Sequence, residues 1–353
     1  MSHTDTLDPT PRNDTILKME SPVKKDKIVS ILKKPSDERS VAVFNPEFLK
    51  QKEAITKTEH ERLQLLFPNK VKLKGHRAFN FLVSLSHASS MLEGNTYTEI
   101  DTRTLLEDNI PSAENTAEET KMLINHKNAF ELIIKASQLE RKLIESVHSE
   151  LSNNDGVENS RHFLPAEFRG TVRTYDDVHI GQTTYIPPVD YPGRKPTISD
   201  YLDTIIETAN TTENPLEKSI YLFTRLPYLQ AFRDCNKRTS RLIGNLPLLL
   251  ASAPPISFNG FAKPAYNRSI VAFYEFGNTE LFKEGFISAY INSALHFHPF
   301  DPETSIELQL RNKSDLVEEL TAFVINGENC AEADMIIAST GQTIDFGSNG
   351  PEI

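Results

Sequence analysis

The chain has 353 residues, of which 38% are hydrophobic and 25% charged, enough apolar material for one large domain or two modest ones. Its formal net charge of −11 argues against a broad nucleic-acid interface, because such a surface is basic. The two cysteines, Cys235 and Cys330, lack the paired spacing of a disulfide framework or a zinc site.

No run of residues is apolar for long enough to cross a membrane, and the N-terminus lacks the basic and apolar regions of a secretory signal. We therefore expect a cytoplasmic protein without a membrane partner. Export as an effector, by a signal of another kind, stays open.

The first 151 residues divide by composition into a polar tail and a helical region. Residues 1–40 are rich in Asp, Lys, Pro, Ser and Thr and poor in aromatics, which predicts a disordered tail. Residues 41–135 are predicted to be an N-terminal helical region, with one helix at about 84–94. Residues 118–151 form one or two long amphipathic helices, whose apolar stripe is Leu123, Ala129, Phe130, Leu132, Ile133, Ala136, Leu139, Leu143, Ile144 and Val147.

Residues 152–197 are predicted to be loops with one β-hairpin. The run Val178–Pro188 alternates, carries β-formers on both sides of Gly181-Gln182, and ends in two prolines that stop a strand. Taken alone, this pattern is equally typical of a plain surface hairpin.

Helices at 198–208 and 215–229 lead to the segment Gln230–Arg241, which is a short loop running into an apolar helix. The unpaired N–H groups and the dipole of a helix N-terminus favour an anion. Arg238 and Arg241 share one helical face and can reach the same polyanion. Asp234 suits a magnesium ion that bridges phosphate oxygens. The alternative is a basic helix start on a solvated face.

Further helices are predicted at 273–295, as core, and around 316–324, within a C-terminal helical extension at 299–353. The sequence His298-Pro-Phe-Asp301 looks like the start of a second segment of the Gln230–Arg241 kind. Pro302 follows it, without an Asn-x-Arg, so we interpret it as an ordinary loop.

The order of residues from Gln230 to Arg241 resembles the signature of the Fic family, His-x-Phe-x-(Asp/Glu)-Gly-Asn-(Gly/Lys)-Arg-x-x-Arg. Members mostly transfer AMP from ATP to a protein hydroxyl. The resemblance implies ATP and magnesium as cofactors, with Asp234 as the metal ligand and Asn236 ordering the loop. It assigns ATP binding to Cys235, Asn236, Lys237, Arg238 and Arg241, and catalysis to Arg238, Arg241 and the position of Gln230.

Three residues depart from this pattern. Gln230 stands where the family has histidine, and a carboxamide has no useful basicity. Cys235 replaces a glycine. Lys237 replaces the commoner second glycine, as in the Doc branch, whose members transfer a phosphate. Other histidines that could replace the missing base are His148, His162, His179, His296 and His298.

A second motif lies upstream, at Ser89-Ser-Met-Leu-Glu93-Gly94. It resembles the inhibitory motif of the Fic family, (Ser/Thr)-x-x-x-Glu-(Gly/Asn). Ser89 and Glu93 are one turn apart on one helix edge. A carboxylate against Arg241 would neutralise the cation that should hold the γ-phosphate. Alone, the motif is also typical of a solvated helix end before a glycine.

A third match is the predicted hairpin, which resembles the flap of the family. There a protein target is added as an extra strand, and the expected target-binding residues are Ile180, Gly181, Gln182, Thr183, Thr184 and Tyr185. Residues 143–151 resemble the helix that opens the Fic domain, which we place at 136–298. The implied partners are ATP and a protein target, with no nucleic acid, and a homodimer stays open.

The expected fold is mainly α, a Fic-like helical core with a β-hairpin flap and an N-terminal inhibitory helix. The first functional hypothesis is an ATP-binding protein that resembles a protein adenylyltransferase, autoinhibited by Glu93, with transfer weak, altered or lost because of Gln230. Two alternatives stay open. One is a catalytically inactive pseudoenzyme that binds a nucleotide or a target, and the other is a Doc-like phosphotransferase.

Overall fold

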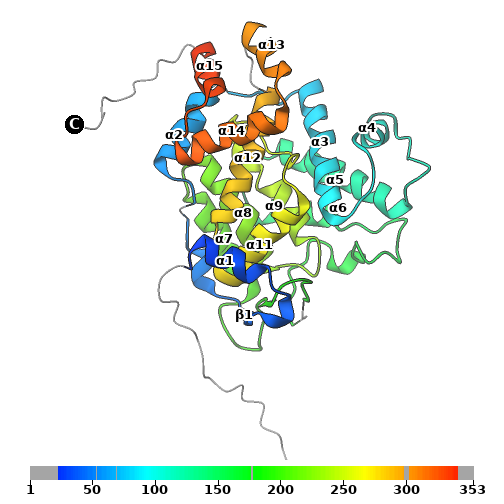
Figure 1. Cartoon of the computed structure of the whole chain (residues 1–353). Helices are drawn as coiled ribbons and strands as arrows, with labels where there is room; N and C mark the ends of the chain where they lie inside the picture. Colours follow the sequence, from blue (N-terminus) through cyan, green and yellow to red (C-terminus); the bar gives the residue numbers. More distant parts are fainter. Residues whose placement is uncertain (1–22, 53, 69, 176–177, 298–301, 341–353) are drawn as a thin grey trace, which may run out of the picture.

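The computed structural model describes the chain except residues 1–22, 53, 69, 176–177, 298–301 and 341–353. It is mainly helical, which confirms the predicted fold class (Figure 1). The N-terminal half contains α1 (Lys25–Leu32), α2 (Lys57–Leu66), α3 (His76–Glu93), α4 (Glu99–Asp108), α5 (Ala117–Lys135) and α6 (Arg141–Leu151). The C-terminal half contains α7 (Ile198–Asn210), α8 (Pro215–Leu229), α9 (Asn236–Ile243), α10 (Leu246–Leu250), α11 (Lys263–Phe276), α12 (Glu280–Phe297), α13 (Pro302–Leu310), α14 (Lys313–Asn326) and α15 (Ala331–Ser339).

Local sequence signals set where several helices begin. The helices α2, α5 and α7 begin after Thr56, Thr116 and Thr197, and each threonine forms a reciprocal capping box with an acidic residue three positions later. At the other end, Gly94 stops α3 with φ of 105°, a left-handed conformation that a side chain would disfavour. The motif Ser89–Gly94 is therefore the last turn and the C-cap of one continuous helix.

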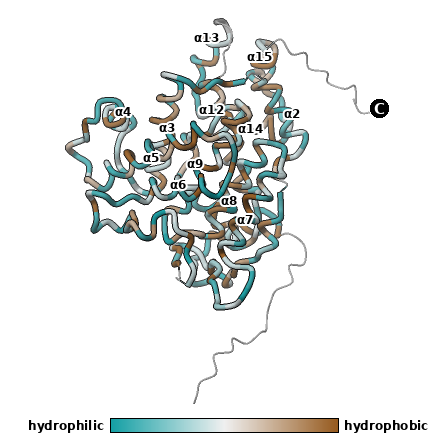
Figure 2. The backbone as a smooth tube through the Cα atoms, turned by 180° about the vertical axis from the view of Figure 1, so that it is seen from behind, coloured by the Kyte–Doolittle hydropathy of each residue, from teal (hydrophilic) through white to brown (hydrophobic). Residues whose placement is uncertain are grey.

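Helix α8 lies at the centre of the molecule, and α7, α9, α10, α11 and α12 pack around it. Twelve of its fifteen residues are buried, since it is apolar on almost every side. Figure 2 shows apolar residues concentrated on the helices around it. Near its C-terminus, Tyr228 stacks on Tyr185 with ring centroids 4.7 Å apart and meets Phe273 edge-on at 5.2 Å. These contacts fix the end of α8. The loop Gln230–Cys235, the phosphate loop, begins directly after it.

The predicted disordered tail at 1–40 is wrong for its described part. Residues Lys25–Leu32 form α1, and Ile28 is fully buried. The helix packs on α11, and Lys25 pairs with Glu284 of α12. The average composition of the tail is polar, but Ile28, Ile31 and Leu32 share one helical face, and this local pattern is enough for docking.

The predicted β-hairpin at Val178–Pro188 is also wrong for the residues described there. Gly181 and Gln182 do form a turn, but the strand β2 (Tyr185–Ile186) pairs in parallel with β1 (Ala42–Val43) and not with residues 178–180. The N–H of Thr184 donates to Glu275 Oε1 at 3.0 Å. The second half of the segment is thus held by α11 and by a distant part of the chain.

One hydrophobic core contains residues from the three segments predicted at 41–135, 136–298 and 299–353, among them Phe48, Phe130, Phe223 and Ile336. The C-terminal α14 and α15 pack on α2, and α14 also packs on α12. The boundaries at 40/41, 135/136 and 298/299 stay predictions. Within the described residues, the helices are too short or too polar to cross a membrane.

Candidate functional site

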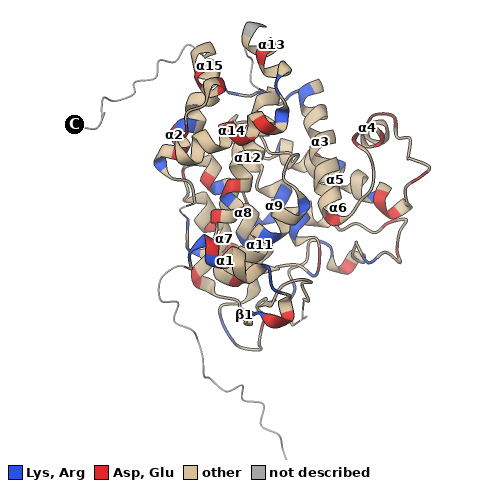
Figure 3. Cartoon of the chain, in the orientation of Figure 1, with Lys and Arg blue, Asp and Glu red and all other residues tan. Residues whose placement is uncertain are grey.

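The site forms where the chain turns from α8 into α9. Gln230 and Cys235 have φ of 50° and 59°, and these two left-handed residues reverse the chain within a short loop. Among the described residues, no side chain caps the first turn of α9. Its N–H groups therefore keep the capacity to bind an anion. Figure 3 shows basic residues gathered on α9.

A cavity of about 490 Å³ lies over this junction. Its wall contains Glu93 from α3, residues 178–181 of the flap segment, and residues 233–238 of the loop and α9. Three parts of the chain that the sequence marked as separate motifs thus enclose one space. The cavity volume suits a ligand of nucleotide size.

Asn236 ties the phosphate loop together. Its Oδ1 accepts from the N–H of Phe232 at 3.0 Å, while its Nδ2 donates to the Phe232 carbonyl at 2.8 Å and to Gln230 Oε1 at 2.9 Å. The expected role of Asn236 in ordering the loop matches this geometry. Because Asn236 is buried, an alanine here would leave three polar groups without their partner.

His148 of α6 supports the loop from below. Its ring stacks on Phe232 with centroids 3.8 Å apart, its Nε2 donates to the Asp234 carbonyl at 3.1 Å, and its Nδ1 accepts from the N–H of Gly170 at 2.9 Å. Burial lowers the pKa of His148 to about 3, so the ring is neutral. Both ring nitrogens are committed, and His148 is a structural support rather than a free base.

One nitrogen of the Arg238 guanidinium is hydrogen-bonded and another is unsatisfied. Its Nη2 donates to the His162 carbonyl at 2.7 Å, whereas its Nη1 is buried and finds no hydrogen-bond partner among the described residues. Arg238 as a whole is only 3% exposed. A buried, unsatisfied cationic N–H group costs free energy, and an anionic oxygen in the cavity would satisfy it.

Arg241 is completely buried, and α3 provides most of its partners. Its Nε donates to Ser89 Oγ at 2.8 Å, and its Nη2 donates to the Ser89 carbonyl at 3.2 Å and to Glu93 Oε1 at 2.6 Å. Its Nη1 donates to Tyr266 Oη at 3.1 Å. Of the two arginines singled out from the sequence, Arg241 is thus occupied by the chain itself.

Glu93 is held by two cations of α9. Besides the contact with Arg241, its Oε2 lies 3.6 Å from Lys237 Nζ. Burial alone would raise the pKa of Glu93, but the charges of Arg241, Lys237 and Arg238 outweigh it and hold the pKa well below the ordinary carboxyl range. The carboxylate is therefore ionised, and it neutralises the positive end of α9.

His126 of α5 also belongs to this cluster, although no sequence pattern indicated it. Its Nδ1 donates to the Met122 carbonyl at 2.8 Å, which leaves Nε2 to accept from the Ser89 hydroxyl at 2.9 Å. Burial lowers the pKa of His126 to about 3 and keeps it neutral. His126 orients Ser89, and Ser89 in turn accepts from Arg241.

Gln230 is tied into the structure. Its Nε2 donates to the Pro227 carbonyl at 2.7 Å and lies 3.4 Å from Tyr274 Oη, and its Oε1 accepts from Asn236. It is 6% exposed. The carboxamide therefore links α8, α9 and α11, and it has no basic nitrogen to take a proton.

Asp234 and Cys235 are the last residues of the loop before α9. The Cys235 thiol lies 3.8 Å from the carbonyls of Leu151 and His162, and burial raises its pKa well above the ordinary value. The thiol is therefore protonated and unreactive. The N–H of Cys235 donates to Asp234 Oδ1 at 2.6 Å, while Oδ2 lies 3.7 Å from Arg238 Nη2.

The Asp234 side chain is 47% exposed. One accessible carboxylate beside a phosphate site fits magnesium, which in proteins usually keeps water and phosphate oxygens as its other ligands. The donor set at Asp234 is thus consistent with the metal role expected from the sequence.

The flap segment is the run Val178–Pro188. Residues 182–185 form its anchored half, and residues 178–181 form the half that faces the cavity. Arg39 donates to the Gln182 carbonyl at 2.8 Å and pairs with Glu275 at 3.2 Å, and Thr183 Oγ1 donates to Glu275 at 2.7 Å. Tyr185 Oη donates to the Tyr228 carbonyl at 2.7 Å. Of the six residues expected to bind a target, Ile180 and Gly181 line the cavity, and the other four belong to the anchored half.

Of the remaining histidines named from the sequence, His179 lines the cavity together with Gln230. His162 contributes its carbonyl to Arg238, and His296 Nε2 lies 2.9 Å from Lys313 Nζ. His298 lies outside the described residues.

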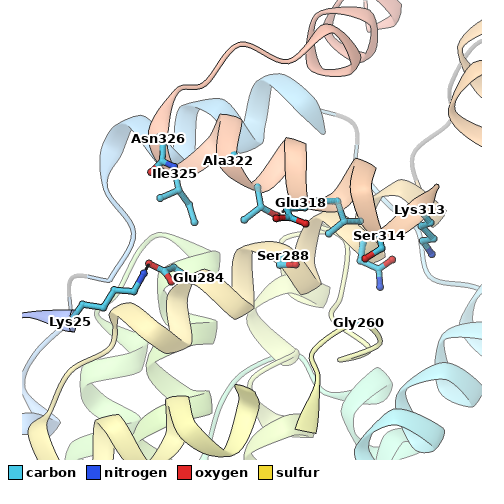
Figure 4. A pocket seen from close by; sticks show the side chains of 13 residues that line it. Lys25, Gly260, Glu284, Ser288, Lys313, Ser314, Glu318, Ala322, Ile325 and Asn326 are labelled. Carbon is cyan, nitrogen blue, oxygen red and sulfur yellow. Dashed lines mark hydrogen bonds and ion pairs between the residues drawn. The ribbon is translucent and has the colours of Figure 1, made fainter. Parts of the chain in front are cut away.

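A larger cavity, of about 720 Å³, lies between α12 and α14 (Figure 4). Its polar lining includes Glu284, which is paired with Lys25, and Glu318. No phosphate loop or helix N-terminus with clustered arginines faces it, as far as the described residues go. The loop and α9 residues that the sequence analysis singled out, Asp234 to Arg238, therefore line the smaller cavity.

Comparisons with known proteins concern the family and the fold. The Fic/DOC family model matches residues 138–248. Two curated relatives, protein adenylyltransferase fic-1 of Caenorhabditis elegans and of Caenorhabditis briggsae, are each 28% identical over 171 residues, which cover 47% of this chain and 31% of the relative. The chain thus spans about a third of the length of the curated relatives it matches.

Solved structures support the fold. Fic-1 (residues 134–508) from C. elegans aligns with a TM-score of 0.52 at 18% identity and covers 68% of this chain and 70% of its own. A Fic family protein from Desulfovibrio desulfuricans G20 aligns with a TM-score of 0.53 at 15% identity and covers 83% and 86%. At such identities the likeness concerns the fold.

Proposed function

This chain belongs to the Fic family, and from that premise we propose that it binds ATP with magnesium as a protein adenylyltransferase-like protein, held inhibited by Glu93. The observation that carries the proposal is the contact of 2.6 Å between Glu93 and Arg241 of α9, made by the same carboxylate that lies 3.6 Å from Lys237 in the first turn of that helix. A carboxylate sits where a triphosphate would put its terminal charge. The Fic domain is proposed at 136–298, preceded by the helical region that carries Glu93.

The residues proposed to bind the nucleotide form two groups. The N–H groups of the first turn of α9, which the N-cap residue Cys235 leaves without a side-chain cap, would hold phosphate oxygens, and Arg238 Nη1, buried and without a partner among the described residues, would join them after a small shift of its side chain. Arg241 and Lys237 would serve the terminal phosphate only after Glu93 leaves. Asp234 would hold magnesium, which neutralises phosphate charge when bound.

The protein target would bind along the cavity half of the flap segment. The anchored half is unsuitable for a new strand, because Thr184 O accepts from Ala42 and Thr184 N–H donates to Glu275. An extended target segment at residues 178–181 would bring its hydroxyl over the phosphate loop. The substrate would thus be a Ser, Thr or Tyr hydroxyl in an extended region of a protein.

Transfer through Gln230 is expected to be slow compared with a family member that has histidine in the motif. Loss of a general base that no other group replaces costs about 10²–10⁴ in rate, and Gln230 is also fixed by its own hydrogen bonds. This second point favours one alternative function, a pseudoenzyme that binds ATP or a target without turnover. Phosphate transfer of the Doc type is suggested by Lys237 alone. The Lys237 ammonium lies 3.6 Å from Glu93.

Labelled ATP separates these functions. The Glu93→Gly variant is incubated with magnesium and ATP labelled at the α- or the γ-phosphate, alone and with a cell lysate, and Arg241→Ala in the same background is the control. Label from the α position only indicates AMP transfer, and label from the γ position only indicates phosphate transfer.

ATP binding without transfer indicates the pseudoenzyme. Absence of ATP binding in Glu93→Gly contradicts the proposal altogether.

A further inference from the structure

We propose that His179, on the cavity half of the flap segment, is the group that takes the proton from the target hydroxyl in place of the missing motif histidine. This inference rests on the proposed function and adds a catalytic residue to it. The structural basis is that His179 and Gln230 line the same cavity, together with Asn236 and Arg238.

The proton acceptor must be a group in the cavity that can be basic near neutral pH. Gln230 is excluded by its chemistry. Glu93 is bound to Arg241 and Lys237, and these cations lower its basicity. Asp234 accepts from the N–H of Cys235 and is the proposed metal ligand. An imidazole has the basicity that the reaction requires.

The other described histidines do not reach the cavity as bases. His126 and His148 are buried, neutral and hydrogen-bonded through both ring nitrogens. His60 lies 3.1 Å from Asn214 Nδ2, and His296 is at Lys313. The rest, His76, His87 and His162, are not part of the cavity wall. Among the histidines that the structure describes, only His179 has this position.

The alternation of the flap segment gives His179 the required exposure. Ile180 packs against the hydrophobic core, whereas His179 and Gly181 are exposed. Because Ile180 contacts the core and its neighbour His179 is exposed, His179 lies on the face away from the core. A target strand laid along residues 178–181 would have this imidazole beside it. The base and the incoming hydroxyl would then be positioned by one segment.

The reaction balances with this assignment. The target hydroxyl oxygen attacks the α-phosphorus of ATP, and a new O–P bond forms as the bond from that phosphorus to the bridging oxygen of the β-phosphate breaks. Pyrophosphate leaves with the electron pair of that bond. The proton of the hydroxyl moves to the free ring nitrogen of His179.

The test compares three proteins in the Glu93→Gly background: the parent, His179→Ala, and His76→Ala. His76 is an exposed histidine at the start of α3, outside the cavity, and serves as the matched control. AMP transfer is followed with α-labelled ATP, and ATP affinity is measured by isothermal calorimetry. We expect His179→Ala to lower kcat by about 10²–10⁴, with ATP affinity unchanged, and His76→Ala to match the parent.

Two further readouts separate a base from a structural residue. Added imidazole should restore part of the rate of His179→Ala and leave the parent unaffected. The acid limb of the pH profile of kcat should be present in the parent and absent in the variant. Loss of ATP affinity together with kcat would overturn the assignment, because it indicates a structural role.

The outcomes also distinguish this inference from the proposed function. If the parent transfers AMP and His179→Ala does so at the same rate, His179 is not the base and the proposed function stands. If the parent binds ATP but transfers nothing, the proposed transfer and the role of His179 fail together.

Discussion

Replacing Glu93 by Gln tests whether one carboxylate both stabilises the fold and blocks the phosphate site. The change keeps the side-chain volume and removes a charge 2.6 Å from the fully buried Arg241. Breaking a buried ion pair costs about 3–5 kcal/mol. The lower end applies, because Glu93 is 18% exposed and a carboxamide can still accept from Arg241.

A loss of about 3 kcal/mol translates into a modest thermal shift. With an unfolding entropy of about 2.1 cal/mol/K per residue, the 353 residues give about 0.7 kcal/mol/K, so the melting temperature falls by about 4 °C. Magnesium and ATP should then reverse it. Ligand at 100 times its Kd adds about 2.7 kcal/mol, which is again about 4 °C, and the wild type should gain less.

The pH dependence of this difference has a fixed sign. The pKa of folded Glu93 lies below its value in the unfolded chain, so its contribution is present above the unfolded carboxyl pKa of about 4.3 and is lost as pH falls toward the folded value. We therefore expect a constant difference in melting temperature between wild type and Glu93→Gln from pH 6 to 8, shrinking below about pH 4.

Scanning calorimetry with and without magnesium and ATP measures these shifts. Glu47→Gln is the matched control, because Glu47 pairs with Lys50 at 2.7 Å but is 65% exposed, and exposed pairs contribute little. An unchanged melting temperature for Glu93→Gln would show that the buried pair does not stabilise the fold. A lowered melting temperature that ATP fails to raise would refute the link to the phosphate site.

Three other predictions follow from the same cluster. His126→Leu removes the acceptor that orients Ser89, so ATP affinity measured by calorimetry should rise several-fold in the wild-type background and stay unchanged in Glu93→Gly; additive effects would contradict the coupling. The effect of Lys237→Gly on ATP affinity should depend on the background. In the wild type it weakens the interaction that holds Glu93 by about 0.2–1 kcal/mol, which raises ATP affinity by up to about 5-fold. In Glu93→Gly it lowers ATP affinity. Cys235, buried and protonated, should resist maleimide in the native protein at pH 8 and react after unfolding, as mass spectrometry will show; fast native labelling would contradict its burial.

The sequence predicted what depends on local pattern and on motif order. The apolar stripe between residues 118 and 151 became α5 and α6, with Leu123, Phe130 and Ile144 buried. The juxtaposition of Glu93 with Arg241, 148 residues later, came from the order of the motifs and their family likeness. No helical periodicity could have placed these two residues together.

The failures concern non-local contacts. The strand at Tyr185 pairs with Ala42, 143 residues away, so alternation and a Gly-Gln turn could not identify its partner. His126 lies in an apolar helix, and nothing in its neighbours shows that its ring nitrogen meets Ser89. The average composition of residues 1–40 hid the short apolar face of α1.

The most direct measurement is a calorimetric titration of ATP with magnesium into three proteins: wild type, Glu93→Gly, and Glu93→Gly with Arg241→Ala. We predict weak binding to the wild type, at least ten-fold tighter binding to Glu93→Gly, and loss of that gain when Arg241 is also removed. Equal affinity for all three proteins, or no heat of binding in Glu93→Gly, would contradict the claim that Glu93 occupies a triphosphate site at the start of α9.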